Sequence, residues 1–162
     1  MQLHSLKSRR DEEGFTLIEL MVVVLIIAIL IAIAIPTFLG ARQRAQDRAA
    51  QSDLRNALTA EKTYYTDNED YSNVVADMKA IEPSLDWESA AAPTAKGKVA
   101  VETQDTGNIV CVEGQSKSGT FFILADVATG GGAGTYYNKG AATVACPTSS
   151  AAAPTGWTVD GW

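Results

Sequence analysis

The sequence has almost no histidine, and this shortage limits the chemistry that the chain can perform. Its single histidine, His4, lies before Gly14, so the rest of the chain carries no imidazole. Imidazole is the commonest general base and the commonest metal ligand in proteins. Histidine-dependent catalytic sites are therefore excluded from the body of the chain. Carboxylate or lysine chemistry would remain, but no motif marks it, so we expect no enzyme, no cofactor and no metal site.

The chain also lacks an excess of positive charge. Its 162 residues carry a formal net charge of −6. The basic and acidic side chains before Gly14 cancel, so the whole excess of negative charge lies after that residue. Phosphate binding requires a cationic face. Nucleic acid is therefore not expected as the main partner.

Cysteine is scarce too, with only Cys111 and Cys146 present. Disulfides persist in oxidising compartments and are rare in the cytosol. If the body of the chain is exported, we expect the two cysteines to form a bridge. Two buried free thiols are the alternative. The bridge would close a loop of about 35 residues, which is worth roughly 3–4 kcal/mol in the chain-entropy model.

A long apolar run is the strongest feature that the sequence does contain. Residues 15–39 carry one charged side chain, Glu19, and residues 20–35 carry no polar side chain at all. A helix over residues 15–39 covers roughly 37 Å, more than a hydrocarbon core of about 30 Å. The run therefore predicts a single-pass anchor. A secretory signal peptide fits less well, because its apolar part usually has only about 7–15 residues.

Glu19 is not explained by a membrane anchor alone. A charge at the centre of a membrane helix costs about 2.5–3.5 kcal/mol on insertion scales, and less near the helix end. Cleavage after Gly14 would create an amino group on Phe15, at a helix N-terminus where a carboxylate is already favoured. Glu19 would then have a partner in its own chain or in a neighbouring chain. The alternative is that Glu19 marks the interfacial edge of the helix.

The segment "GFTLIELMVVVLIIAILIAIAIP", which begins at Gly14, resembles the N-terminal signature of type IV pilins and pseudopilins. The resemblance is dense over residues 14–60, does not extend to the C-terminal half, and is greatest to type IVa major pilins. It implies that residues 1–14 are a leader, which a prepilin peptidase removes after Gly14. It also implies N-methylation of Phe15. Glu19 would pair with the Phe15 amine of an adjacent subunit during assembly.

The resemblance carries further expectations about location, partners and function. The precursor would be a single-pass protein of the cytoplasmic (inner) membrane, in contact with lipid. The processed chain would form a homo-oligomeric helical filament outside the cell, with the peptidase, an inner-membrane assembly platform and its ATPase motor as partners. It would be a structural pilus subunit used for adhesion, motility or DNA uptake. The alternative is a minor pilin or a pseudopilin of a type II secretion or competence system.

Two positions depart from the family pattern. The leader ends in the acidic triplet of "RRDEEG" where basic residues are usual, and Ala28 lies where many pilins have a glycine. Pro36 removes a backbone donor and clashes with the carbonyl of Ala32, so we expect a kinked or loosened helix there. If assembly melts the helix before Pro36, Ala28 should limit how far the melting spreads.

After the apolar run, the sequence predicts an amphipathic continuation of the helix over residues 40–66. Good helix formers dominate this stretch. Its apolar side chains recur at steps of three and four residues, which indicates one buried stripe. The stripe consists of Ala50, Leu54, Ala57, Leu58 and Tyr65. The polar segment "TDNEDYS" then ends the helix as a solvated turn; it lacks the glycine and the distal glutamate of an EF-hand calcium loop.

A connecting region, residues 67–98, is expected to hold one short helix within residues 74–87, with Pro83 ending or breaking it. Residues 99–162 predict an antiparallel sheet and a tail. Strand-like runs rich in β-branched and aromatic residues occupy 99–103, 108–113 and 120–127, with a shorter run at 135–138. The glycine-rich "TGGGAG" is expected to be a hairpin turn.

The expected fold is α+β. A long N-terminal helix, with a transmembrane half and an amphipathic half, would pack on a small antiparallel sheet. A bridge between Cys111 and Cys146 would attach the tail to the sheet, which resembles the disulfide-bounded C-terminal region of many pilins. We expect Trp157 and Trp162 to dock on the domain, with a subunit contact as the alternative.

Overall fold

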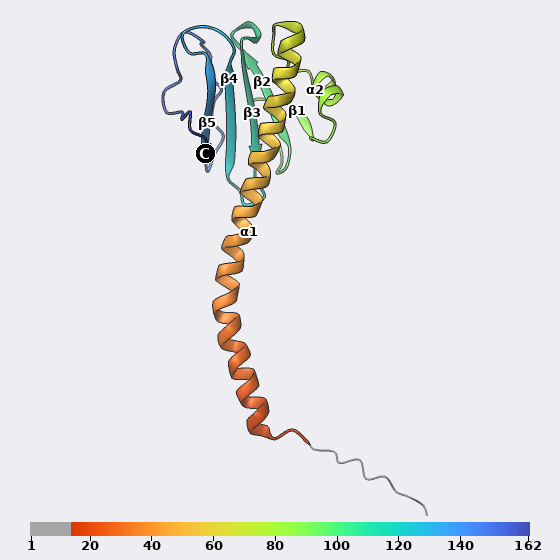
Figure 1. Ribbon diagram of the computed structural model, residues 1–162, viewed down its shortest axis with the longest axis vertical. Helices are drawn as coiled ribbons and strands as arrows, with labels where there is room; N and C mark the ends of the chain where they lie inside the picture. The colour runs from red at the N-terminus through yellow and green to blue at the C-terminus, as the bar shows by residue number, and fades with distance from the viewer. Residues whose placement is uncertain (1–13) are drawn as a thin grey trace, which may run out of the picture. The chain divides into compact units, whose positions relative to one another are not determined.

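The computed structural model describes residues 14–162, so the predicted leader lies outside the described residues except for Gly14. The chain divides into two units between Gly40 and Ala41. One helix, α1 (Leu17–Asn68), contributes residues 17–40 to the first unit and residues 41–68 to the second (Figure 1).

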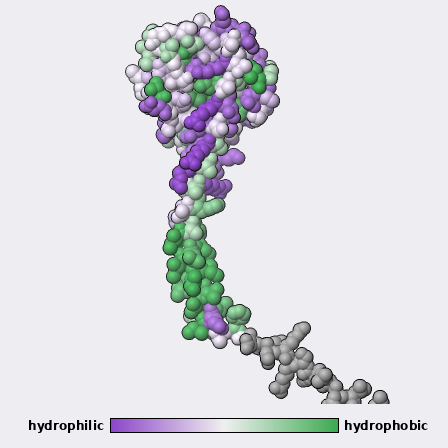
Figure 2. Space-filling view, in the orientation of Figure 1, coloured by the Kyte–Doolittle hydropathy of each residue, from purple (hydrophilic) through white to green (hydrophobic). Residues whose placement is uncertain are grey.

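The first unit presents an apolar surface that no other part of the described chain, residues 14–162, covers. Its large hydrophobic side chains, from Phe15 to Leu39, are between 48% and 90% exposed. Figure 2 shows most of this part of the helix in green, with a small hydrophilic patch near its start. Within the described residues, α1 is the one helix that is long and apolar enough to cross a membrane.

α1 runs through Pro36 without a break. The hydroxyl of Thr37 donates to the carbonyl of Ile33 at 3.1 Å, beside the place where Pro36 has no N–H to donate. Residues 28–35 are helical in the single chain. The effect of Ala28 on melting concerns the assembled state and stays a prediction. A filament map with continuous non-helical backbone over residues 28–35 would contradict it.

The second unit contains a five-stranded sheet in the order β1-β2-β3-β4-β5. The strands are β1 (Trp87–Ser89), β2 (Val99–Gln104), β3 (Ile109–Gln115), β4 (Phe121–Val127) and β5 (Gly134–Gly140). From β2 onward each strand pairs antiparallel with the next, so the predicted meander is confirmed. The segment "TGGGAG" connects β4 and β5, as predicted for a hairpin turn.

The region before β2 holds one short helix within residues 74–87, as predicted, and also a short strand that was not predicted. Helix α2 (Val75–Ile81) is followed by Glu82 at φ −129°, because a residue that precedes proline is disfavoured in the α-helical region. Trp87 then begins β1, which pairs in parallel with β2. The Trp87 indole donates to the carbonyl of Glu82 at 2.9 Å, and the side chain is buried.

The predicted apolar stripe of α1 packs on one face of the sheet (Figure 1). Leu54, Ala57 and Leu58 are buried, and Ala50 and Tyr65 are partly buried against the same cluster. The sheet contributes alternate residues of its strands to this cluster, because successive strand side chains point to opposite faces. These residues are Val99, Val101, Val110, Val112, Phe122 and Leu124.

The other face of the sheet forms a second core under the C-terminal tail. Cys111 of β3 is bonded to Cys146 of the tail, which confirms the predicted disulfide. The two sulfurs are buried among the remaining members of the cluster: Ile109, Ile123, Ala125, Val127 and Tyr136. The sheet is therefore the middle layer between α1 and the tail.

Both tail tryptophans dock on the second unit. The Trp162 indole donates to the carbonyl of Asn138 at 2.7 Å, and its ring lies edge-on to Phe122 with centroids 5.6 Å apart. The guanidinium of Arg55 lies 5.3 Å from the ring centroid. Trp157 is partly buried against the second core. The prediction of docking is therefore confirmed.

Candidate functional site at the start of the apolar helix

Gly14, Phe15 and Glu19 are brought together at the start of α1. Gly14 is exposed, and a Cβ built on it would meet no atom within 4 Å. The packing of the described chain therefore does not require glycine at this position. Phe15 is 90% exposed and precedes the first helical residue, Leu17, by two positions.

Thr16 and Glu19 form a reciprocal cap on the first turn of α1. The backbone N–H and the hydroxyl of Thr16 donate to Oε2 of Glu19 at 2.9 Å and 2.7 Å. The N–H of Glu19 donates back to Oγ1 of Thr16 at 3.2 Å. This is the capping-box arrangement, in which two backbone donors that lack a helical partner are satisfied.

This cap supplies a partner for Glu19 that the sequence reasoning missed. The signal was present, because threonine followed three residues later by glutamate, just before an apolar run, is a helix-start pattern. Both bonds from Thr16 use Oε2. Among residues 14–162, no donor bonds to the other oxygen of Glu19, so Oε1 is available to a second partner.

Two buried carboxyl groups of the second unit each have one oxygen without a partner among the described residues, and sequence reasoning missed both. Glu61 of α1 is fully buried; its Oε2 accepts from the N–H of Ser72 at 3.3 Å, and its Oε1 has no partner among the described residues. Burial raises its pKa to about 8, an effect that the Ser72 bond opposes.

Glu113 of β3 is buried in the same way on the other face of the sheet. Its Oε1 accepts from the N–H of Val144 at 3.3 Å, and burial raises its pKa to about 7. Glu61 packs on the α1 side of the sheet and Glu113 under the tail, so they do not form a paired acid–base site. Within the described residues, no group of three or more His, Cys, Asp and Glu side chains is placed to hold a metal ion.

The N-terminal region matches a known family model. The description of that model is "Prokaryotic N-terminal methylation motif", and it matches residues 9–35. The match includes Gly14, Phe15 and Glu19, together with most of the apolar run.

Similarity to two curated type IV pilus proteins covers about two fifths of the chain. The type IV wide pilus major component PilA4 of Thermus thermophilus is 38% identical over 64 residues, which are 40% of this chain and 49% of that protein. The type IV major pilin protein PilA of Myxococcus xanthus is 47% identical over 60 residues, which are 37% of this chain and 27% of that protein.

A second kind of relative belongs to a secretion system. The type II secretion system core protein G of Vibrio cholerae is 34% identical over 76 residues, which are 47% of this chain and 52% of that protein. The chain thus spans about half the length of two of these relatives and about a quarter of the third. The chain therefore carries an N-terminal methylation motif and is similar over part of its length to two type IV major pilins.

Proposed function

We propose that the chain is a prepilin, the precursor of a structural subunit that polymerises through its N-terminal helix into an extracellular type IV pilus. The uncovered apolar part of α1, whose first turn holds the capped Glu19, carries this proposal. Exposed apolar patches larger than a few hundred Å² mark membrane or protein contacts. The same surface would anchor the precursor in the cytoplasmic membrane and later pack against other copies in the filament.

Processing would occur at the glycine that the described chain does not need for its own packing. A prepilin peptidase would cut after Gly14 and methylate the new N-terminus at Phe15. The exposure of both residues supports this assignment. The free Oε1 of Glu19 would accept from the Phe15 amine of an adjacent subunit, while Thr16 keeps holding Oε2.

The remaining partners follow from this role. An inner-membrane assembly platform and its ATPase motor would extract the helix from the membrane, and the filament would serve adhesion, motility or DNA uptake. The second candidate is a minor pilin or a pseudopilin of a type II secretion or competence system. The similarity to type II secretion core proteins supports that candidate.

The test uses material sheared from the cell surface. We expect this chain to dominate the sheared filaments, and mass spectrometry of it should show an N-terminus at methylated Phe15. An intact Met1 terminus in assembled material would refute the proposal. A chain that is processed but present only in trace amounts in the sheared fraction would favour the second candidate.

A further inference from the structure

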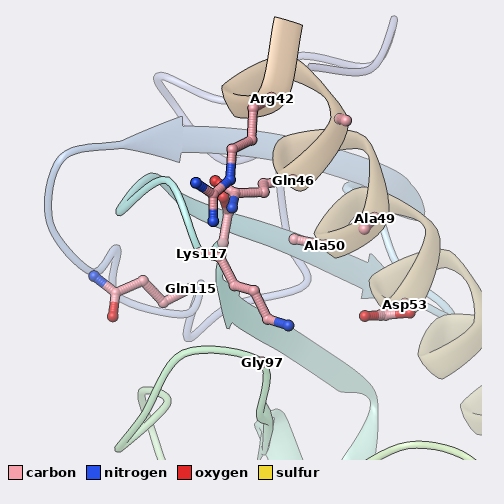
Figure 3. A pocket seen from close by; sticks show the side chains of 10 residues that line it. Arg42, Gln46, Ala49, Ala50, Asp53, Gly97, Gln115 and Lys117 are labelled. Atoms are coloured by element: carbon pink, nitrogen blue, oxygen red, sulfur yellow. The ribbon is translucent and has the colours of Figure 1, made fainter. Parts of the chain in front are cut away.

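A groove of about 550 Å³ lies in the second unit, between α1 and the ends of neighbouring turns (Figure 3). Arg42 and Gln46 line it from the helix, with Asp53 further along. Gly97 and Lys117 line the opposite wall. Figure 3 shows the side chains of Arg42 and Lys117 entering the same space from the two walls.

The walls of the groove are held together by hydrogen bonds. Oδ1 of Asp47 on α1 accepts from the hydroxyls of Ser116 and Ser118 at 2.6 Å and 2.5 Å, which attaches the β3–β4 turn to the helix. The N–H of Gly97 donates to the carbonyl of Gln115 at 3.1 Å. The groove is therefore formed before any partner arrives.

The cations of the groove have no carboxylate partner in the described chain. The ion pairs among residues 14–162 are Lys62 with Asp126 and Lys98 with Glu88. Neither pair involves Arg42 or Lys117, and both of these side chains are on exposed residues. Lys96 adds a third cation, since its Nζ donates to the carbonyl of Lys117 at 3.3 Å.

The opposite end of the same unit is acidic. α1 ends at Asn68, and the exposed carboxylates Asp67, Glu69 and Asp70 surround that end. At about 1.5 Å per residue, this end lies roughly 40 Å along the helix from Arg42. The second unit therefore carries a basic groove at one end and an unpaired acidic segment at the other.

We infer that the groove of one copy binds the acidic segment, residues 67–70, of a second copy. This inference rests on the proposed function, because it describes a contact within the filament. A contact between two different surfaces of identical subunits repeats without closing, and so builds an open fibre. Like ends repel and unlike ends attract, so the contact also makes all subunits point the same way.

Lipid phosphate is the competing occupant, because Arg42 follows the apolar run by only a few residues. The groove suits a peptide better. It contains the amides of Gln46 and Gln115, which can pair with the N–H and C=O groups of a peptide backbone, whereas a phosphate offers no donor to their oxygens.

Charge reversal in the full-length chain tests the contact. We expect Arg42→Glu combined with Lys117→Glu to lower the yield of sheared filaments by at least about tenfold, because like charges would then meet. The single variant Lys117→Glu is compared with a matched control, Lys79→Glu. Lys79 is an exposed lysine of α2 that lies outside both the groove and the acidic segment. The control should retain a yield within about twofold of the unmodified chain.

The decisive experiment restores opposite charges between the groove and the acidic segment. Adding Asp67→Lys and Glu69→Lys to the double variant should return filament yield to within about threefold of the unmodified chain. Normal filaments from the double variant, or a loss that these reversals do not repair, would overturn the inference. Thermal unfolding of each variant in detergent shows whether the second unit is folded.

Two further measurements separate the alternatives. Filaments of a Lys117→Cys, Glu69→Cys chain should give a ladder of disulfide-linked subunits on a non-reducing gel, and a normal filament yield without a ladder counts against the contact. If the double variant instead loses binding to phosphatidylglycerol vesicles and the acidic reversals do not restore filaments, lipid is the occupant. Absence of filaments from the unmodified chain would contradict the proposed function, whereas equal filaments from all variants would contradict only this contact.

Discussion

Thr16 and Glu19 hydrogen-bond to each other at the start of α1. The Glu19 carboxylate is therefore oriented before an adjacent subunit is present. The bond from the Thr16 hydroxyl, at 2.7 Å, is the shorter of the two that Glu19 accepts from this residue. Thr16 caps the helix and also holds the Glu19 carboxylate. It therefore links the stability of the helix to the position of the carboxylate that we propose for assembly. Substitutions at the two residues should separate them.

Glu19→Ala should leave membrane insertion intact and abolish or severely reduce filaments, because the amine of the next subunit loses its acceptor. Thr16→Ala should have a smaller effect on filament yield, since it removes a cap worth about 0.5–2 kcal/mol but leaves the carboxylate in place. Thr16→Ser is the control and should behave like the unmodified chain. Membrane fractionation and sheared-filament yield give both readouts; normal yield from Glu19→Ala would remove its assembly role.

Glu61 gives the second unit a dependence on pH. Its folded pKa, about 8, lies above its ordinary value of 4.5, so the folded state holds the proton more tightly than the unfolded state. The stabilisation is therefore complete below about pH 4.5 and is lost as the pH rises through about 8. Glu113, with a pKa raised to about 7, adds a dependence of the same sign.

Glu61→Gln should remove much of this dependence, because the amide keeps the shape of the side chain and has no proton to lose. The melting temperature of the variant should exceed that of the unmodified chain at pH 8, and the gap should shrink at pH 4. Thermal scans of the full chain in detergent between pH 4 and pH 9 measure the two curves. Parallel curves across this range would show that Glu61 does not titrate on unfolding.

The sequence located the apolar stripe of α1 but not the acid within it. Glu61 lies three residues after Leu58 and seven after Leu54, on the same face of the helix. Periodicity reasoning counts apolar residues, so it passes over a carboxyl group that is buried at a stripe position. Glu113 was missed for the same reason, in a strand that begins with four apolar residues.

At the scale of elements, the strands with several β-branched residues were predictable and the short one was not. The sequences of β3 and β4 are rich in β-branched or aromatic residues, which predicts a strand from local sequence alone. β1 has only three residues and exists because Trp87 pairs in parallel with Val99, twelve positions later. This pairing depends on the path by which the chain after Pro83 reaches β2. No pattern within residues 87–89 predicts that path.

The disulfide holds the tail against β3 across a sequence separation of 35 residues. Cys111→Ser with Cys146→Ser should lower the free energy of unfolding by roughly 3–4 kcal/mol, from the loop-closure entropy. The tail should become the first site of proteolysis, while the α1 face of the sheet keeps its own core. Melting temperatures with and without reductant, and limited proteolysis read by mass spectrometry, test both statements. An unchanged melting temperature after complete reduction would contradict them.

At the scale of the whole molecule, the two units differ in whether their large apolar side chains are buried. Both hydrophobic clusters lie within the second unit, and the large apolar side chains of the first unit are exposed. The second unit therefore has what it needs to fold in water, and the first has a surface made for lipid or for other copies.

A fragment that begins at Ala41 should consequently be soluble and folded without detergent. Its melting temperature should lie within a few degrees of that of the full chain in detergent, because no core residue is removed. The full chain should require detergent or lipid for extraction. A fragment that is unfolded by circular dichroism, with its disulfide formed, would show that residues before Ala41 contribute to the fold.

The apolar run also has a mechanical consequence for the proposed filament. Between residues 20 and 35 the helix surface offers no hydrogen-bonding side chain that could fix one lengthwise alignment over another. Alignment must then be set at the two ends, by Glu19 on one side and by the contacts of the second unit on the other. Because residues 20–35 have no polar side chain, helices of neighbouring subunits can slide past one another under tension without breaking side-chain hydrogen bonds in this stretch. The fibre would therefore lengthen before its subunits unfold.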